Sequence, residues 1–205
     1  MDVQVRPAEP GDVDAAVPLI YASGTHEWDY GFATRRHPAT DWILAAFLGR
    51  SATESYRGYQ VALVDGRVVG VGSFLPGAAF DTRNALRFIW ESIRAYGLRE
   101  CWGVMRRTLR LMELMPSPGK DALFIQRVGV SPELRGHGIG RALLDDQIRA
   151  ARAAGLRRAV LDVAVTNPRA QALYERLGFR VTGERQLSVR PPVEVPPQRR
   201  MQLDF

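Results

Sequence analysis

The segment from residue 123 to about residue 154 constrains this chain more than any other part of the sequence. It begins with the strand-like run Leu123–Val130 and continues into a long amphipathic helix. Between them, residues 131–141 read Ser-Pro-Glu-Leu-Arg-Gly-His-Gly-Ile-Gly-Arg. On the helix, five apolar residues share one arc at a period of 3.6: Ile139, Leu143, Leu144, Ile148 and Ala151. Asp145 is spaced to pair with Arg149. The segment predicts a strand, a bare turn and a helix packed on a sheet.

The glycines of this turn suit an anion. The first amides of a helix have no intrahelical partner, and the helix start carries a partial positive charge. Glycines at 136, 138 and 140 remove the side chains that would keep a ligand off those amides. Arg135 and Arg141 add full charges, and His137 should point to solvent. The turn therefore predicts a pyrophosphate site built mostly from backbone.

Two other interpretations of the glycines stay open. The Walker pattern is absent, and the Rossmann pattern fails because Arg141 stands where its third glycine would fall. Asp162, 22 residues past Gly140, occupies the place of a ribose-binding acid. Only 43 residues follow Asp162, however, which is too few to complete a doubly wound domain. A glycine-rich turn that binds nothing is the second alternative.

The remaining pattern predicts a mixed α/β (α+β) fold. Strand-like runs occur at 3–6, 59–64, 68–74, 123–130, 159–165, 179–189 and 201–205. Helical runs occur at 13–21, 41–47, 86–93, 102–112, 139–154 and 167–177, whereas residues 23–32 favour a loop or a broken helix. Asp65-Gly66-Arg67 predicts a hairpin, and four prolines in 190–198 predict an extended loop. We expect one domain over residues 1–205, with a mostly antiparallel sheet of about seven strands flanked by helices and a helical insertion at about 81–119.

The composition of the chain limits the classes of partner that it is expected to bind. The chain of 205 residues carries a net charge of +6, but its only lysine is Lys120, and the arginines are scattered without a nucleic-acid-binding motif. Cys101 is the only cysteine, and the three histidines are dispersed, so no disulfide or metal site is expected. No signal peptide or membrane-spanning run is evident. We expect a soluble cytoplasmic protein that binds neither nucleic acid nor membrane.

Arg-Gly-x-Gly-x-Gly at residues 135–140, after a strand ending in Val-Gly-Val-x-Pro, closely resembles the GNAT superfamily of acyl-CoA N-acyltransferases. Residues 167–179, Asn-Pro-Arg-Ala-Gln-Ala-Leu-Tyr-Glu-Arg-Leu-Gly-Phe, are similar to that family's second signature and lie at the right distance downstream. The two motifs cover about residues 124–184, a little under a third of the chain. Residues 1–122 match the family only in outline.

The resemblance implies roles for particular residues. Three strand residues would offer backbone hydrogen bonds to the pantetheine arm of acetyl-CoA: Val128, Gly129 and Val130. The loop around the pyrophosphate would comprise Arg135, Gly136, His137, Gly138, Ile139, Gly140 and Arg141. Asn167 would contact the cofactor where two strands split. Tyr174 would lie beside the thioester sulfur and protonate the departing thiolate.

The second motif also has a purely structural interpretation. Asn167 is a good N-cap, Pro168 suits the first helical position, and Gly178 suits the position after the helix. Tyr174 belongs to an apolar stripe at helical spacing with Ala170, Leu173 and Leu177. The pattern alone favours a core role for Tyr174; the family match favours catalysis.

The acceptor site is less defined. An alkylamine is mostly protonated at neutral pH, so a carboxylate, or a water chain ending on one, must take its proton. Glu27 and Asp29 are candidates, because they lie where the family builds its acceptor site, among Trp28, Tyr30 and Phe32. The acids would attract a cationic amine that the aromatic rings cover. An ordinary surface loop is the alternative, and Asp81 and Asp121 are weaker candidates.

Together these observations predict an N-acetyltransferase that moves an acetyl group from acetyl-CoA to a primary amine by direct attack in a ternary complex. Cys101 should be a buried or idle thiol, outside the chemistry. A non-catalytic acyl-CoA sensor and a basic nucleic-acid-binding regulator remain as alternatives. The insertion at 81–119 could wall the acceptor pocket or form a homodimer contact. The acceptor itself, a small molecule or a peptide, is open.

Overall fold

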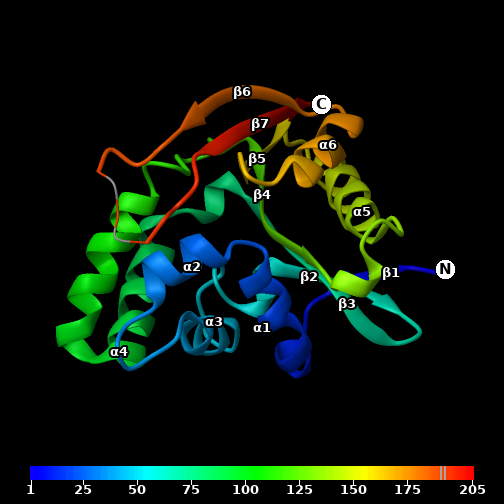
Figure 1. Ribbon diagram of the computed structural model, residues 1–205. Coiled ribbons are helices and arrows are strands. Elements are labelled where there is room, and N and C mark those ends of the chain that lie inside the picture. Colours follow the sequence, from blue (N-terminus) through cyan, green and yellow to red (C-terminus); the bar gives the residue numbers. More distant parts are fainter. Residues whose placement is uncertain (190, 192) are drawn as a thin grey trace.

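The computed structural model describes residues 1–189, 191 and 193–205, and these form one seven-stranded sheet with helices on both faces (Figure 1). The strands are β1 (Gln4–Pro7), β2 (Tyr59–Val64), β3 (Arg67–Pro76), β4 (Ala122–Val130), β5 (Arg158–Ala164), β6 (Arg180–Arg185) and β7 (Gln198–Asp204). The α-helices are α1 (Val13–Ala22), α2 (Thr25–Phe32), α3 (Ala39–Phe47), α4 (Thr82–Leu111), α5 (Ile139–Ala153) and α6 (Pro168–Arg176). Short 3₁₀ helices occupy Pro10–Asp12, Tyr56–Gly58, Gly77–Ala79 and Pro132–Leu134.

The strand order is β1-β2-β3-β4-β5-β7-β6. All neighbouring strands are antiparallel except β4 and β5, which run parallel because α5 crosses over between them. The expected mixed, mostly antiparallel sheet flanked by helices is therefore confirmed.

The helices divide between the two faces of the sheet. Helices α5 and α6 cover one face, and α1 to α4 lie on the other (Figure 1). The predicted apolar arc of α5 is buried: Ile139, Leu143, Leu144, Ile148 and Ala151 all belong to the core under that helix. On the opposite face, Trp42, Phe47, Tyr59 and Val61 are among the residues that form the core of α1 and α3.

Short-range signals explain several boundaries. Asp65 and Gly66 have φ values of 51° and 75°, the left-handed pair that a two-residue hairpin turn requires between β2 and β3. The Asn167 side chain accepts a hydrogen bond of 3.1 Å from the amide of Ala170 and so caps α6. Asp81 caps α4 in the same way, accepting from the amide of Asn84 at 2.8 Å.

Of the loop or broken helix expected at 23–32, the structure shows the broken helix: α1 ends at Ala22, and α2 begins at Thr25, where its buried side chains pack on α3 and α4. Three other local expectations are wrong. Asp145 was expected to pair with Arg149 but pairs with Arg141 at 3.1 Å, because Arg141 lies four residues before it on the same helix and is an equivalent i,i+4 partner. Strand β6 spans only 180–185, where β7 is present to pair with it. The expected loop at 190–198 ends one residue early, since Gln198 begins β7; residues 190 and 192 lie outside the described residues.

The expected helical insertion is α4, which bends at Gly97, where φ is 69°. We call residues 82–96 its first arm and residues 98–111 its second arm. Cys101 is buried in the second arm, as expected. None of the described helices combines the length and the apolar character needed to cross a membrane.

Candidate active site

The parallel strands β4 and β5 separate partway along their length. They pair only from Ala122 with Arg158 to Ile125 with Leu161. Beyond Ile125, β4 remains paired with β3 but no longer with β5. The edge of β4 that faces β5 is therefore open from residue 126 to residue 130, which includes the three strand residues of the sequence prediction, Val128, Gly129 and Val130.

A bulge in β4 lies where the two strands part. Gln126 is opposite Ser73 and Gly129 is opposite Val71, so β4 holds one more residue than β3 between these pairs. Arg127, within the bulge, has a φ of 56°. Its guanidinium donates to the Tyr59 hydroxyl at 2.8 Å, pairs with Glu54 at 2.8 Å and lies 4.9 Å from the centre of the Trp28 ring.

Sequence reasoning missed this ion pair. The available signal was the one charged residue inside a largely apolar strand, and its partner Glu54 gave no such signal. Burial raises the pKa of the Glu54 carboxyl, although the Arg127 guanidinium acts against that shift. The pair connects β4, the chain before β2 and helix α2, so it sets the bulge against the opposite layer.

Helix α5 begins without a cap. Gly138, at a φ of 84°, precedes it, and no side chain caps its first turn. The first amide that reaches a carbonyl is that of Ala142, which donates to Gly138 at 2.9 Å. Among the described residues, the amides of Ile139, Gly140 and Arg141 have no hydrogen-bond acceptor. A β-carbon on Gly138 would meet nothing within 4 Å, so the space before these amides is open.

The side chains of the loop at 135–141 do not all contribute positive charge to the site. Arg135 is exposed and donates to the carbonyl of Val130 at 3.1 Å, and Arg141 is shared with Asp145. His137 points to solvent, as expected, whereas the Ile139 side chain is buried and can offer only its amide. Arg169 of α6 is an addition: its guanidinium lies 3.2 Å from where a β-carbon on Gly136 would stand. The folding of α6 against the loop brings it there, which no local pattern indicated.

Asn167 and Tyr174 follow β5 on the face of α5 and α6. The Asn167 oxygen is occupied by its capping bond to Ala170. Tyr174 is 8% exposed, its ring packs 5.9 Å from that of Phe179, and its hydroxyl makes no hydrogen bond to another described residue. Burial raises the pKa of Tyr174 to about 12. The tyrosine is thus both part of the core and a phenol that keeps its proton at neutral pH.

Glu27 and Asp29 point in different directions from α2. Residues two apart on a helix do not share a face. Glu27 accepts a 2.6 Å hydrogen bond from the Gln198 side-chain amide at the start of β7. Asp29 accepts from the Tyr21 hydroxyl of α1 at 3.1 Å. Burial raises the pKa of the Glu27 carboxyl, with the Gln198 hydrogen bond acting against that rise.

The predicted aromatic cover over an amine is wrong. Trp28, Tyr30 and Phe32 are all buried. Phe32 stacks on Trp42 at 5.4 Å, and Trp28 donates its indole N–H to the carbonyl of Ile20 at 2.9 Å. These rings anchor α2 because packing them against α3 and α4 removes more apolar surface from water than a solvent-facing position allows.

The other acids of the sequence prediction have structural partners. Asp81 caps α4, and Asp121 pairs with Arg158 at 2.8 Å. Asp162 pairs with Arg200 of β7 at 2.7 Å, which removes it as a ribose ligand. No group of three or more metal-binding side chains occurs among the described residues.

The end of β5 lies between the helix that carries Glu27 and the helix that carries Tyr174. Gln198, which holds Glu27, is directly opposite Ala164, the last residue of β5. Glu27 belongs to α2, in the layer of α1 to α4, whereas Tyr174 belongs to α6, in the layer on the other face of the sheet. The opening between β4 and β5 joins the two layers here. The arrangement can hold a reacting group in the opening, with a carboxylate on one side and a phenol on the other.

Helix α4 holds α2 in place through hydrogen bonds from both of its arms. The Tyr96 hydroxyl of its first arm donates to the carbonyl of Phe32 at 2.8 Å. Arg107 of its second arm donates to the carbonyl of Ala33 at 3.0 Å. Both arms therefore hold the end of α2, the helix that carries Glu27.

Comparison with known proteins supports an acyl-transfer interpretation of this geometry. A 52-residue segment is 48% identical to the mycothiol acetyltransferase of Beutenbergia cavernae, covering 25% of this chain but only 18% of that protein. An N-acetyltransferase from Staphylococcus aureus Mu50 superposes with a TM-score of 0.71 at 17% identity, over 98% of this chain and 100% of that one. A putative acetyltransferase of Salmonella typhimurium, solved with its cofactor acetyl-CoA, superposes with a TM-score of 0.58 at 19% identity, over 100% and 94% of the two chains. The model of the acetyltransferase (GNAT) family matches residues 21–179, and the chain belongs to that family.

Proposed function

We propose that this protein is an acetyl-CoA-dependent N-acetyltransferase that acts on a primary amine, with residues 1–205 forming one catalytic domain. The observation that carries the proposal is the start of α5. There, the amides of residues 139–141 lack acceptors among the described residues and face an open glycine turn. The unpaired edge of β4 begins directly before that turn. Amides suit a pyrophosphate and a free strand edge suits an extended amide-containing arm, so both parts of the cofactor fit.

When bound, acetyl-CoA supplies an activated acetyl thioester. The chain would hold it with the amides of Ile139, Gly140 and Arg141 and with the backbone of residues 128–130. Arg135, Arg141 and Arg169 would neutralise the phosphates, since exposed arginines exchange their surface partners at little cost. Asn167, through the amide nitrogen that its capping bond leaves free, would contact the arm where β4 and β5 part.

Glu27 is the proposed general base. An amine must lose a proton before it attacks, and a carboxylate with a raised pKa is a stronger base than an exposed one. The Gln198 hydrogen bond holds one carboxylate oxygen and leaves the other for an acceptor or a bridging water. Asp29 is the weaker candidate, because Tyr21 already engages its carboxylate.

Tyr174 is the proposed general acid. Its pKa of about 12 keeps the phenol protonated at neutral pH, so the proton is available to a departing thiolate. Direct attack is favoured over an acyl-enzyme because Cys101, the only cysteine, is buried in α4 and belongs to the core of α1 and α3. Amine acceptors of small-molecule and peptide type both suit this chemistry.

A matched pair at Gly138 tests cofactor binding. Asparagine and aspartate both tolerate a positive φ and fill the same volume, so they differ in charge alone. We expect Gly138→Asp to weaken CoA binding at least 30-fold relative to Gly138→Asn in isothermal titration calorimetry, because a carboxylate beside the phosphates repels them. Wild-type protein that gives no heat with millimolar CoA, or equal affinities of the two variants, would refute the site.

A thiol-release assay with acetyl-CoA tests turnover. The amine panel should cover polyamines, aminoglycosides, amino acids and peptide N-termini, since the family leaves the acceptor open. Release that depends on one amine class supports a transferase. Tight CoA binding without release for any amine would favour the acyl-CoA sensor instead.

A further inference from the structure

Helix α4 presents large apolar side chains to solvent along both arms. Six of them, exposed by 40% to 77%, make up what we call the α4 face: Leu86, Ile89, Trp90, Leu98, Trp102 and Leu109. Within each arm their spacing places them in a single arc. The opposite side of α4 packs on α2 and α3. The apolar residues of α4 therefore lie on two sides of the helix, one packed against the protein and the other exposed to solvent.

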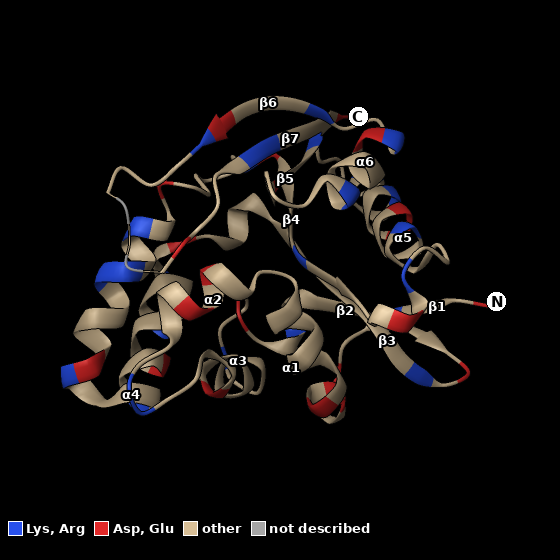
Figure 2. Ribbon diagram, in the orientation of Figure 1, with Lys and Arg blue, Asp and Glu red and all other residues tan. Residues whose placement is uncertain are grey.

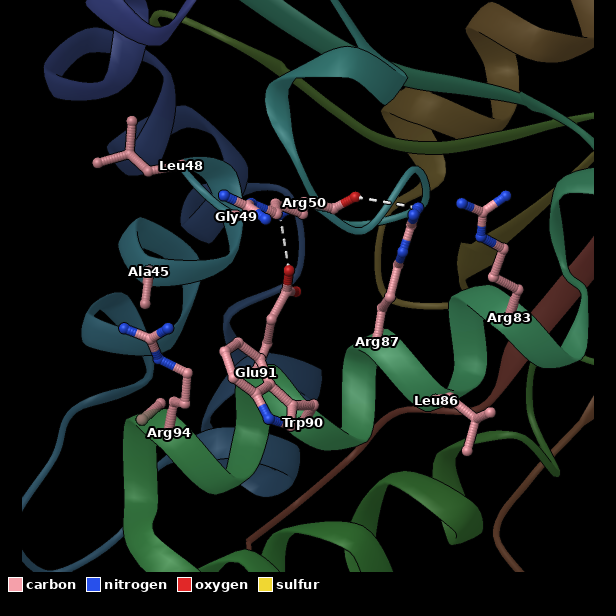
Figure 3. Close-up of a pocket in the computed structure, with 11 residues that line it drawn as sticks. Ala45, Leu48, Gly49, Arg50, Arg83, Leu86, Arg87, Trp90, Glu91 and Arg94 are labelled. Carbon is pink, nitrogen blue, oxygen red and sulfur yellow. Dashed lines mark hydrogen bonds between the residues drawn. The ribbon is translucent and has the colours of Figure 1, made fainter.

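A groove lies beside the first arm. It has a volume of about 1090 Å³ and runs between the end of α3 and α4, with Leu48, Leu86 and Trp90 among its lining residues (Figure 3). Glu91 fixes its floor by accepting from the amides of Arg50 at 2.7 Å and Ser51 at 3.0 Å. These bonds join the segment after α3 to α4, so the groove is formed before anything enters it.

The size of the α4 face matches what a protein interface requires. Tryptophan brings about 150–250 Å² and an aliphatic side chain about 60–120 Å², so the face exposes on the order of 500 Å² of apolar surface. A standard interface buries about 800 Å² per partner, of which roughly 450–520 Å² is apolar. Two solvent-facing tryptophans are also typical of the residues that dominate binding energy.

We propose that the α4 face and its groove form a two-fold interface with a second copy of this chain. A two-fold axis brings the same surface of each copy together, so the α4 face of one protomer would meet the groove of the other, and the contact would occur twice. No other partner is needed to cover the face.

The charges around the α4 face make a second copy and an anionic partner respond to salt in opposite directions. Seven arginines and two glutamates lie on α4. Figure 2 shows blue and red bands on this helix. Three of these arginines are engaged within the protein. Arg94 lies 4.7 Å from the centre of the Trp90 ring, Arg87 donates to the Arg50 carbonyl at 3.4 Å, and Arg107 donates to Ala33. The others would form a cationic rim on both copies, where salt weakens their mutual repulsion.

This rim gives the interface a distinctive salt dependence. A dimer with like-charged rims should tighten as sodium chloride rises from 50 to 500 mM, because screening removes repulsion and leaves apolar burial. Binding to an anionic membrane, an acidic peptide or a nucleic acid would weaken over the same range.

Sedimentation velocity and light scattering on the full chain test the proposal. Wild-type protein at tens of micromolar should have twice the 22.9 kDa protomer mass. Trp102→Glu and Leu98→Glu should each raise the dissociation constant at least 30-fold, as expected for a central apolar contact. Val181→Glu is the matched control, because Val181 is 46% exposed on β6 and lies off α4. Circular dichroism confirms that each variant remains folded.

Three outcomes would overturn the interface. The first is a wild-type monomer at both salt concentrations. The second is a dimer that survives in both folded α4 variants or weakens equally in the Val181 control. The third is a monomer that binds vesicles of phosphatidylglycerol and phosphatidylcholine through α4, with a blue shift of tryptophan fluorescence that Trp102→Phe diminishes. None of these readouts depends on catalysis, so the interface and the enzymatic function can fail separately.

Discussion

Glu27 and Asp29 stand two residues apart on α2, and that spacing turns their carboxylates toward different neighbours. Glu27 meets Gln198 of β7, and Asp29 meets Tyr21 of α1. Composition does not distinguish the two acids, because both lie in one polar stretch. Their environments do, since burial raises the pKa of Glu27, and Glu27 is held beside the end of β5 by Gln198.

Glu27→Gln should lower kcat/KM by about 10²–10⁴, because the amide cannot accept the proton of the amine. In the wild type, activity should fall as the pH drops through the raised pKa of Glu27, since the protonated acid is no longer a base. The variant should lack that acidic limb in a pH–rate profile. Asp29→Asn is the control and should keep it. A normal acidic limb in Glu27→Gln would assign the base elsewhere.

Tyr174→Phe should lower kcat by about 100-fold while leaving CoA affinity within about twofold, since only the phenolic proton is lost. The ring contact with Phe179 survives, so the free energy of unfolding should change by less than about 1 kcal/mol. Stopped-flow thiol release and calorimetry measure the two quantities. Unchanged turnover would remove Tyr174 as the acid and return it to a core role.

At the scale of elements, the bulge in β4 decides where the site opens. The bulge begins at the residue after the last pair of β4 with β5, and its Arg127 is tied to Glu54 and Tyr59. A bulge increases local twist and redirects a strand. The ion pair therefore stabilises the geometry that exposes the edge of β4.

Arg127→Met should cost about 3–5 kcal/mol at pH 7, because it leaves the Glu54 carboxylate buried and unpaired. The loss should shrink as the pH falls. Without Arg127 the folded pKa of Glu54 lies further above its unfolded value, so folding is favoured below the unfolded pKa and penalised as pH rises through the folded one. Urea unfolding between pH 4.5 and 8 measures this. The double variant Arg127→Met, Glu54→Gln should recover part of the loss, and equal losses at every pH would contradict the argument.

At the scale of the whole molecule, the two layers contribute different functions. The layer of α5 and α6 holds the glycine turn and Tyr174, and the layer of α1 to α4 holds Glu27. The opening between β4 and β5 lies between the two layers. A ligand that contacts both sides of this opening should stabilise the fold as a unit.

CoA at 100 times its dissociation constant should add about 2.7 kcal/mol to the free energy of unfolding. For a chain of this size that corresponds to a rise in melting temperature of about 5–10 °C. Differential scanning fluorimetry of wild type and Gly138→Asn should show the rise, larger in the wild type. Gly138→Asp, with affinity weakened at least 30-fold, should show at most about a third of that rise at the same CoA concentration. A rise of equal size in Gly138→Asp would place CoA away from the start of α5.

Much of this protein could be predicted from its sequence, because the deciding interactions are short in range. The turn at Asp65-Gly66, the capping of α6 by Asn167 and the buried arc of α5 each depend on residues a few positions apart. The glycine turn before α5 was predicted for the same reason. Its open amides follow from the geometry of any helix start.

Only the tertiary structure decided the contacts that join distant segments. Glu27 and Gln198 are 171 positions apart, and Arg127 and Glu54 are 73 apart, so no local pattern pairs them. The same holds for burial: Phe32 and Trp102 are equally apolar in sequence, yet one stacks on Trp42 and the other faces solvent. Periodicity orients a side chain on its helix. Whether another element covers that side depends on how the whole chain packs.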